Sequence, residues 1–275
     1  MNVSTTTMKT MRKRNGLGLL AGSLIGTLGG LIGLGGAEFR LPVLMGVFRL
    51  ATLEAVILNK AMSLVVVAAA LLFRGSAISP TLLMEHLDVV VNLLAGSLVG
   101  AWWAAGHAMK LSRHWLNRII LVLLVGLALV MLAEAWAGNH GGGTPLFEAG
   151  PLRIAAGVIA GLVIGIVAAL LGVAGGELLI PTIVLLYGLE IKIAGSLSLM
   201  VSLPTMIVGF ARYTSSDAFA VLRRERPLGV WMAIGSVLGA ALGGVLLGLV
   251  PTRLLLALLG VILLISAIKT FQHAH

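Results

Sequence analysis

The chain has no cysteine, and charged side chains make up only 11% of its 275 residues. The absence of cysteine excludes disulfides, thiolate metal ligands and thiol catalysis. A soluble domain carries about 25% charged residues, so the low charge excludes an ordinary water-soluble protein. A membrane metalloenzyme would need clustered histidines or a His-Glu-x-x-His pattern, and the sequence has neither. We therefore expect neither an enzyme nor a bound cofactor or metal.

Long apolar stretches are what the chain has in abundance. Hydrophobic residues make up 59% of it, and the mean hydropathy is +1.09. Uncharged stretches cover residues 15–37, 89–109, 154–176 and 227–252. Each is long enough to cross about 30 Å of hydrocarbon at about 1.5 Å per residue. We expect an all-α, polytopic protein of the cell inner membrane that contacts lipid. Despite a net charge of +9, we do not expect it to bind nucleic acid, because Lys and Arg in membrane proteins mark cytoplasmic loops.

An internal repeat runs through most of the chain. Glu38 and Glu177 lie 139 positions apart, and the same offset relates seven pairs of glycines without a gap. Chance would give roughly two such pairs, so the similarity is real. We divide the chain into a cytoplasmic tail (1–15), a first repeat (16–136), a linker loop (137–151) and a second repeat (152–275). Together they form one integral membrane domain.

Each repeat contains three ordinary spans and one interrupted piece. The spans are predicted at about 51–73, 88–108 and 114–136, and at about 191–211, 227–249 and 253–271. The remaining pieces, about 16–48 and 154–187, are too long for one helix and short for two full spans. A glycine-rich break followed by Glu and Pro interrupts each of them, at Gly35, Gly36 and Pro42 and at Gly175, Gly176 and Pro181.

The basic residues distinguish two topologies, with the intramembrane Lys60 left out of the count. If each interrupted piece crosses once, the halves are parallel, and 11 Lys and Arg residues lie inside against seven outside. If each piece is a re-entrant hairpin, the repeats are inverted and the count becomes 14 against four. The positive-inside bias favours inverted repeats, with cytoplasmic termini and a periplasmic 137–151 loop.

Irregular backbone at membrane depth needs protein or a watery cavity to satisfy its polar groups. Two symmetry-related glycine breaks therefore predict a transporter whose site lies where the halves meet. The alternative is that glycines only allow helices to approach closely, which we favour for Gly18, Gly22 and Gly26 and their counterparts. Packing alone, however, needs no carboxylate beside a break.

The interrupted pieces resemble a known family. Residues 33–42 (GLGGAEFRLP) and 172–181 (GVAGGELLIP) are similar to the duplicated Gly-rich-then-Pro motif of the TauE/SafE sulfite exporter family. Asn59-Lys60 resembles its Thr-Asn-Lys motif, with Leu58 in place of Thr, and Ala194-Gly195-Ser196 resembles its second, small-hydroxyl motif. The resemblance covers about residues 15–270. It implies the transport of sulfite, sulfonated organic anions or related sulfur compounds, coupled to protons. Both motifs depart from the family by carrying Glu where glycine or a small residue is commoner.

Charged residues at bilayer depth are costly, so each needs a reason. Glu38 and Glu177 are candidates for proton coupling, because desolvation beside a break would raise a carboxylate pKa. Alternatively, each complements a half-helix dipole. Lys60 could neutralise an anion, pair with Glu38 or Glu54, or extend to the interface. Arg40 belongs either to the same site or to its mouth.

Uncharged polar residues follow both breaks and complete the candidate substrate site. They could bind an oxyanion together with half-helix N-termini, or simply hydrogen-bond between helices. These residues are Asn59, Ser63, Ser196, Ser198 and Ser202. We expect a proton-coupled exporter of a small anion. The alternatives are a passive anion channel, which basic linings would suit better than paired Glu, and a non-transporting assembly factor. The oligomeric state is left open, with a homodimer as one alternative.

Overall fold

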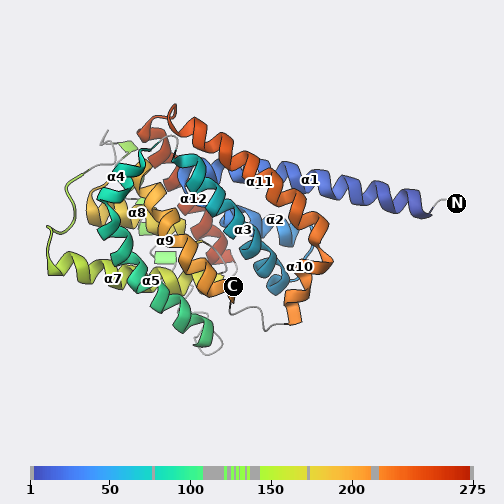
Figure 1. Cartoon of the computed structure of the whole chain (residues 1–275), viewed down its shortest axis with the longest axis horizontal. Helices are drawn as coiled ribbons and strands as arrows, with labels where there is room; N and C mark the ends of the chain where they lie inside the picture. The colour runs from blue at the N-terminus through green and yellow to red at the C-terminus, as the bar shows by residue number, and fades with distance from the viewer. Residues whose placement is uncertain are drawn as a thin grey trace.

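The computed structural model describes residues 3–75, 78–107, 121–122, 125–126, 128–129, 131–133, 135–136, 143–171, 174–211 and 217–272. All regular elements in this part of the chain are helical (Figure 1). The first half contains α1 (Val3–Ile32), α2 (Ala37–Gly46), α3 (Thr52–Arg74), α4 (Pro80–Glu85) and α5 (Leu87–His107). The second half contains α7 (Pro151–Leu171), α8 (Gly176–Tyr187), α9 (Ile191–Ala211), the 3-10 helix η2 (Asp217–Ala220), α10 (Val221–Arg224), α11 (Arg226–Leu247) and α12 (Thr252–Gln272).

Within these described residues, six helices are long and apolar enough to span a membrane, which confirms a polytopic all-α protein. These spans are Arg12–Ile32, Glu54–Arg74, Leu87–Ala104, Pro151–Ala169, Ile191–Ala211 and Arg226–Leu247. The spans predicted near 51–73, 88–108, 191–211, 227–249 and 253–271 correspond to α3, α5, α9, α11 and α12. The predicted span 114–136 falls largely outside the described residues. The starts of α2 and α8, of α3 and α9, and of α5 and α11 lie 139 positions apart.

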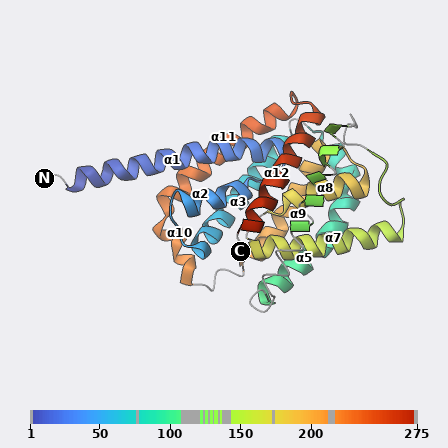
Figure 2. The same ribbon diagram turned by 180° about the vertical axis from the view of Figure 1, so that it is seen from behind.

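Two pairs of long helices interlock the two halves. Helix α1 packs along α11, and α7 packs along α5, so each pair joins one half to the other (Figure 1, Figure 2). Glycines set the close approach, because a Cβ would overlap the facing backbone: Gly22 with Met232 and Gly26 with Ser236, and equivalently Gly161 with Leu93 and Gly165 with Ser97. Close helix packing through small residues is a main source of helix association in membranes. The packing interpretation of these glycines is confirmed.

Each interrupted piece is a long helix, a break and a short helix. In the first half the break follows Ile32, and Gly33, Gly35 and Gly36 have φ values of +97°, +78° and +72°. In the second half, Gly175 has φ +75° and α8 begins at the next residue, Gly176. Left-handed backbone suits glycine, which has no Cβ to collide. Pro181 lies inside α8, whereas Pro42 belongs to α2 but its side chain is outside the described part.

Both hairpins return to the end of the molecule where they begin. Arg14 of α1 lies 5.9 Å from the ring centroid of Phe48, which follows α2. At the equivalent positions, Arg153 of α7 lies 5.6 Å from the ring of Tyr187, at the end of α8. Because α2 has only 10 residues, or about 15 Å of helix, the return arm is about half a bilayer long.

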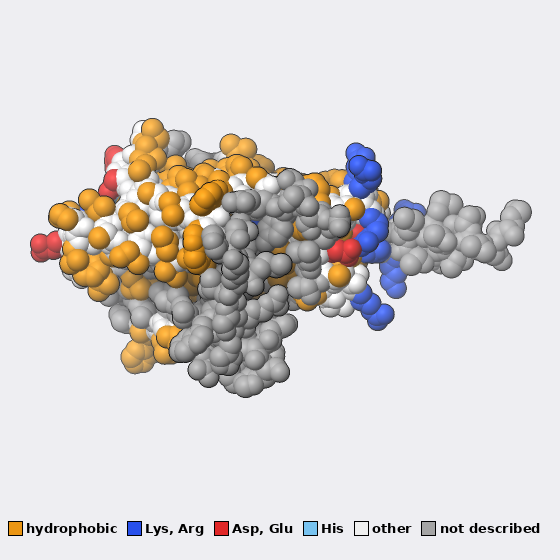
Figure 3. All heavy atoms as spheres, turned by 90° about the horizontal axis from the view of Figure 1, so that it is seen from below, with side chains coloured by type: hydrophobic (Ala, Val, Ile, Leu, Met, Phe, Trp, Pro, Cys, Tyr) orange, Lys and Arg blue, Asp and Glu red, His pale blue; other side chains and the backbone are white. Residues whose placement is uncertain are grey.

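Charges gather at the end from which α1 projects (Figure 3). There, Arg14 pairs with Glu225 at 2.8 Å and Arg224 with Glu54 at 2.7 Å. The hydrogen bond from Arg224 to Glu54 raises the pKa of that guanidinium. Helix α3 starts beside this pair and finishes at Arg74, against the start of α9, so it crosses the molecule from one end to the other.

Candidate functional site

Four Arg, Lys or Glu side chains are buried in the described part of this sparsely charged chain. Arg40, Lys60, Arg74 and Glu177 have relative exposures of 0%, 1%, 1% and 5%. Burial of a charge in a membrane protein is costly and requires compensation by neighbouring polar groups. All three cations belong to the first half. At the 139-residue offset, the second half has the uncharged residues Leu179, Leu199 and Tyr213 in their places. The electrostatics of the two halves therefore differ although their backbones correspond.

Arg40 organises the first hairpin. Its Nη1 donates to Ser63 Oγ at 2.8 Å and to Asn59 Oδ1 at 3.3 Å. Its Nη2 donates to Ser236 Oγ at 3.3 Å and to the Gly35 carbonyl at 3.5 Å. These bonds join the return arm α2 to α3 and to α11 of the other half. The predicted residues Arg40, Asn59 and Ser63 thus lie together. In this structure they hydrogen-bond to one another and to other groups of the protein.

Asn59 and Ser236 complete this cluster. The Asn59 amide donates to the carbonyl of Ala37, the first residue of α2, at 3.0 Å. Ser236 was not among the predicted site residues, although the repeat pairs it with Ser97. That pairing was the available sequence signal, since polar residues at equivalent buried positions suggest a shared role. The cluster fixes the position of the first hairpin.

Arg74 was also missed, because a basic residue at the end of a span usually marks the interface. Its Nη1 instead donates to the carbonyls of Gly30 and Leu31, at 2.7 and 2.9 Å. Its Nη2 donates to the Lys192 carbonyl at 2.7 Å, and its Nε to Ser196 Oγ at 2.9 Å. The last carbonyls of a helix have no donors within the helix, so Arg74 caps α1 and ties it to α9.

The breaks of the two hairpins meet where the halves meet. Ser198 donates to the Gly33 carbonyl at 3.0 Å, and a Cβ on Gly33 would lie only 2.7 Å from Gly195 Cα. A Cβ on Gly176 would lie 3.0 Å from Leu34 Cα. Of the predicted serines, Ser198 therefore bonds directly to the first hairpin, whereas Ser196 bonds to Arg74, which in turn bonds to that hairpin. Their bonds satisfy broken-helix backbone, as irregular structure at membrane depth requires.

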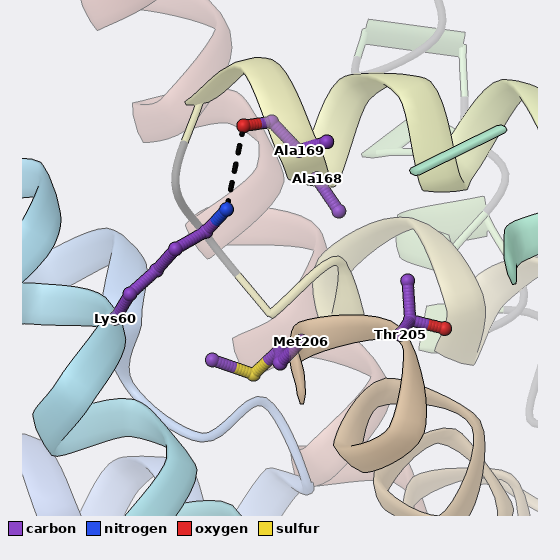
Figure 4. Close-up of a pocket in the computed structure, with 5 residues that line it drawn as sticks. All are labelled: Lys60, Ala168, Ala169, Thr205 and Met206. Atoms are coloured by element: carbon purple, nitrogen blue, oxygen red, sulfur yellow. Dashed lines mark hydrogen bonds between the residues drawn. The ribbon is translucent and has the colours of Figure 1, made fainter. Parts of the chain in front are cut away.

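Lys60 lies at a small recess between the halves (Figure 4). Its Nζ donates to the Ala169 carbonyl, near the end of α7, at 3.4 Å. The recess is lined by Lys60 from α3 and by Ala168, Ala169, Thr205 and Met206 from α7 and α9. It is too narrow for a water molecule. A Cβ on Gly209 would lie 3.1 Å from Nζ, so this glycine leaves space for the ammonium.

The remaining predicted hydroxyl, Ser202, stands apart from the first-half cluster. It is the counterpart of Ser63, but Leu179 occupies the position equivalent to Arg40. Its Oγ is buried and has no hydrogen-bond partner within the part of the chain that the structure describes. One turn further along α9, Thr205 shares a 2.8 Å hydrogen bond with Ser97. Ser202 thus places a buried hydroxyl on α9 close in sequence to Thr205 and Met206, which line the recess.

The two predicted proton-coupling residues lie at the starts of the return arms. Glu177 is in the first turn of α8, next to the break, and its side chain is buried. The side chain of Glu38, in α2, lies outside the described part. The N-terminus of a helix favours a carboxylate, so this position suits both proton handling and complementation of the dipole. No group of three or more His, Asp or Glu residues that could hold a metal occurs among the residues searched, which are the described ones.

Comparison with known proteins shows which family the chain resembles over most of its length. The family model described as "Sulfite exporter TauE/SafE" matches residues 18–270. No curated protein and no solved structure matches the chain. The matched region includes both hairpins, the three buried cations of the first half and the recess between the halves. With nearly its whole length covered, the chain belongs to the TauE/SafE family of sulfite exporters, which are membrane transporters.

Proposed function

We propose that the chain is a secondary transporter that exports a small anion, sulfite or an organosulfonate, across the cell inner membrane. The position of Lys60 carries this proposal. Its ammonium is buried at a recess between the two halves, where a fixed cation can replace part of the hydration of an anion. A substrate anion would accept a hydrogen bond from Nζ in place of the Ala169 carbonyl.

Proton coupling is the second part of the proposal. Glu177 is a buried carboxylate in the first turn of a helix that begins at a membrane-depth break. Burial makes the ionised form costly, which suits a group that gains and loses a proton during a transport cycle. Glu38 takes the equivalent place in the first half by sequence.

We also propose inverted repeats with cytoplasmic termini. The matching Arg14–Phe48 and Arg153–Tyr187 contacts support hairpins that leave on the side they enter. The bias of basic residues toward the end that contains Arg14 supports a cytoplasmic location for that end. In such transporters the substrate site lies at the interface of the repeats, near the midplane.

Flux into proteoliposomes tests the function. Purified protein is offered sulfur oxyanions, sulfonates and carboxylates, each with and without an imposed pH gradient. We expect saturable flux of a sulfur anion that the gradient accelerates, and loss of most of this flux in Lys60→Met. Lys192→Met is the matched control, because it removes a cation that does not line the recess. Gradient-independent, non-saturable flux would favour the passive channel, and absence of flux for every anion would favour the assembly factor.

Glu177→Gln separates coupling from binding. Glutamine keeps the size and much of the hydrogen bonding of glutamate but cannot titrate. If Glu177 carries a proton, acceleration by the gradient should disappear while exchange without a gradient survives. If it only complements the helix dipole, flux should stay coupled and the melting temperature should fall slightly, since that interaction contributes about 0.3–1 kcal/mol.

A further inference from the structure

The repeat relates two sets of buried oxygen atoms, and in the first set these oxygens surround a cation. That cation is the guanidinium of Arg40, which lies in the return arm α2. Its hydrogen bonds go to neutral oxygens of the break, of α3 and of α11. These acceptors are Asn59 Oδ1, Ser63 Oγ, Ser236 Oγ and the Gly35 carbonyl.

The second half repeats the oxygens but not the cation. At the 139-residue offset, the three side-chain acceptors correspond to three buried hydroxyls. These are the hydroxyls of Ser198, Ser202 and Ser97. Thr205 adds a fourth buried hydroxyl, where the first half has Val66. The counterpart of Arg40 is Leu179, so the sequence supplies no guanidinium at this place.

Helix α9 presents three of these hydroxyls along one face. Ser198, Ser202 and Thr205 are spaced by four and three residues, and residues at these spacings are neighbours on a helix surface. Thr205 shares a 2.8 Å hydrogen bond with Ser97, which joins this face to α5. In Figure 4 the Thr205 hydroxyl points away from Lys60. The four hydroxyls, which we call the second-half hydroxyl set, therefore belong to the α5–α9 contact.

The protons of this set are already donated to backbone carbonyls. Ser198 donates to the carbonyls of Gly33 and Gly195, at 3.0 and 2.8 Å. Thr205 donates to the Val201 carbonyl at 2.8 Å. A hydroxyl has one proton and two lone pairs, so these oxygens have lone pairs left to offer and no further proton. Such a set suits a cation better than an anion.

Ser202 supplies an independent indication that a ligand belongs here. Its Oγ is buried and has no hydrogen-bond partner in the part of the chain that the structure describes. Its counterpart Ser63 accepts a 2.8 Å hydrogen bond from Arg40. A buried hydroxyl without a partner is costly. Ser202 is thus left without a partner at the position where the first half has a cation.

We propose that the second-half hydroxyl set binds a small monovalent cation, sodium, at the place equivalent to the Arg40 guanidinium. Transporters hold sodium with oxygens beside broken helices and with the C-terminal ends of half-helices. The C-terminal turn of α7, where the helix dipole is negative, lines the same recess as Thr205. Such a site needs neither imidazole nor thiolate. The inference goes beyond the proposed function, because this ion binds in the absence of substrate.

Binding of radioactive sodium to the purified full-length chain tests the proposal without any substrate. We expect saturable binding that unlabelled sodium displaces and N-methylglucamine, which is too large, does not. Sodium chloride should also raise the melting temperature by about 2–4 °C or more over N-methylglucamine chloride of equal ionic strength. If only water occupies the site, both signals are absent and the proposal is overturned. That result leaves the transport function standing, because flux is measured separately.

The two equivalent serines provide a matched pair of variants. Ser202→Ala should abolish sodium binding without lowering the melting temperature in N-methylglucamine, because it removes a hydroxyl that has no partner. Ser63→Ala removes an acceptor of Arg40, so it should lower the melting temperature in both salts and keep the response to sodium. Sodium binding of wild-type strength in Ser202→Ala contradicts the proposal.

A tethered cation should replace the ion. Leu179→Arg restores the guanidinium that the repeat places in the first half, and Leu179→Met is the matched neutral control. We expect sodium to bind at least about tenfold more weakly to Leu179→Arg and with little change to Leu179→Met. Undiminished sodium binding in a folded Leu179→Arg protein counts against the proposal. Should this variant fail to fold, the serine pair still decides.

Discussion

A buried arginine with four protein acceptors holds its neighbours in place. The guanidinium of Arg74 is planar and presents five N–H donors, and it reaches acceptors on α1 and α9 at once. Lysine cannot copy this geometry, because its ammonium is a point charge with three donors. The arginine is therefore a positioning residue for the first hairpin rather than a direct substrate ligand.

Removing this side chain should destabilise the protein. We expect Arg74→Met to lower the free energy of unfolding by about 3 kcal/mol, because buried carbonyls lose their donors. Arg253→Met is the control, since Arg253 is exposed and its loss should cost at most about 0.5 kcal/mol. Thermal unfolding in detergent measures both. Equal melting temperatures for the two variants would show that Arg74 does not hold the helices together.

Arg49 is strained where its counterpart is not. It is a non-glycine residue with φ +56°, and Gly188, 139 positions later, has φ +69°. The left-handed conformation costs an L-residue about 1–2 kcal/mol. We expect Arg49→Gly to raise the melting temperature, with a gain smaller than that cost because glycine also increases the entropy of the unfolded chain. Arg49→Ala removes the same charge but retains the strain, so a similar gain in that variant would contradict this explanation.

At the scale of the element, the crossing of α1 and α11 depends on residues without side chains. A Cβ on Gly26 would overlap the backbone of Ser236, whereas a Cβ on Gly16, in the same helix, meets nothing within 4 Å. We expect Gly26→Ala to lower the free energy of unfolding by about 1–3 kcal/mol, the usual cost of overpacking. Gly16→Ala should be neutral or slightly stabilising, because alanine favours helix. Similar unfolding temperatures for both variants would argue against a close crossing.

Prediction from sequence succeeded for elements and was incomplete for contacts. Long apolar runs predict spans because a bilayer demands them, and paired glycines predict breaks because left-handed backbone demands glycine. The partners of Arg74 could not be predicted, since Gly30 and Lys192 are far from it in sequence and accept through backbone carbonyls. Ser196 and Ser198 were predicted as polar groups at the site, but which neighbour each one bonds depends on the helix packing. Side-chain composition carries no information about these backbone acceptors.

At the scale of the whole molecule, matched contacts relate the two halves. Arg14, near the start of the membrane span of α1, lies beside Phe48 and Glu225, and Arg153, at the start of α7, lies beside Tyr187. Because α3 connects the Arg224 region to the start of α9, these two groups of contacts belong to opposite ends of the molecule. A chain that begins its two repeats at opposite ends should insert them with opposite orientation.

This orientation can be measured because the chain contains no native cysteine. Gly143→Cys places one thiol in the exposed linker, where a side chain meets nothing within 4 Å. Arg223→Cys places one at the opposite end, at an exposed position of α10. With inverted repeats and cytoplasmic termini, an impermeant maleimide should label the first variant in intact cells and the second only after the membrane is opened. Labelling of both variants from the same side would require parallel halves, and the reverse pattern would place the basic end outside. The positive-inside bias opposes that reversed insertion, since it holds Lys- and Arg-rich loops in the cytoplasm.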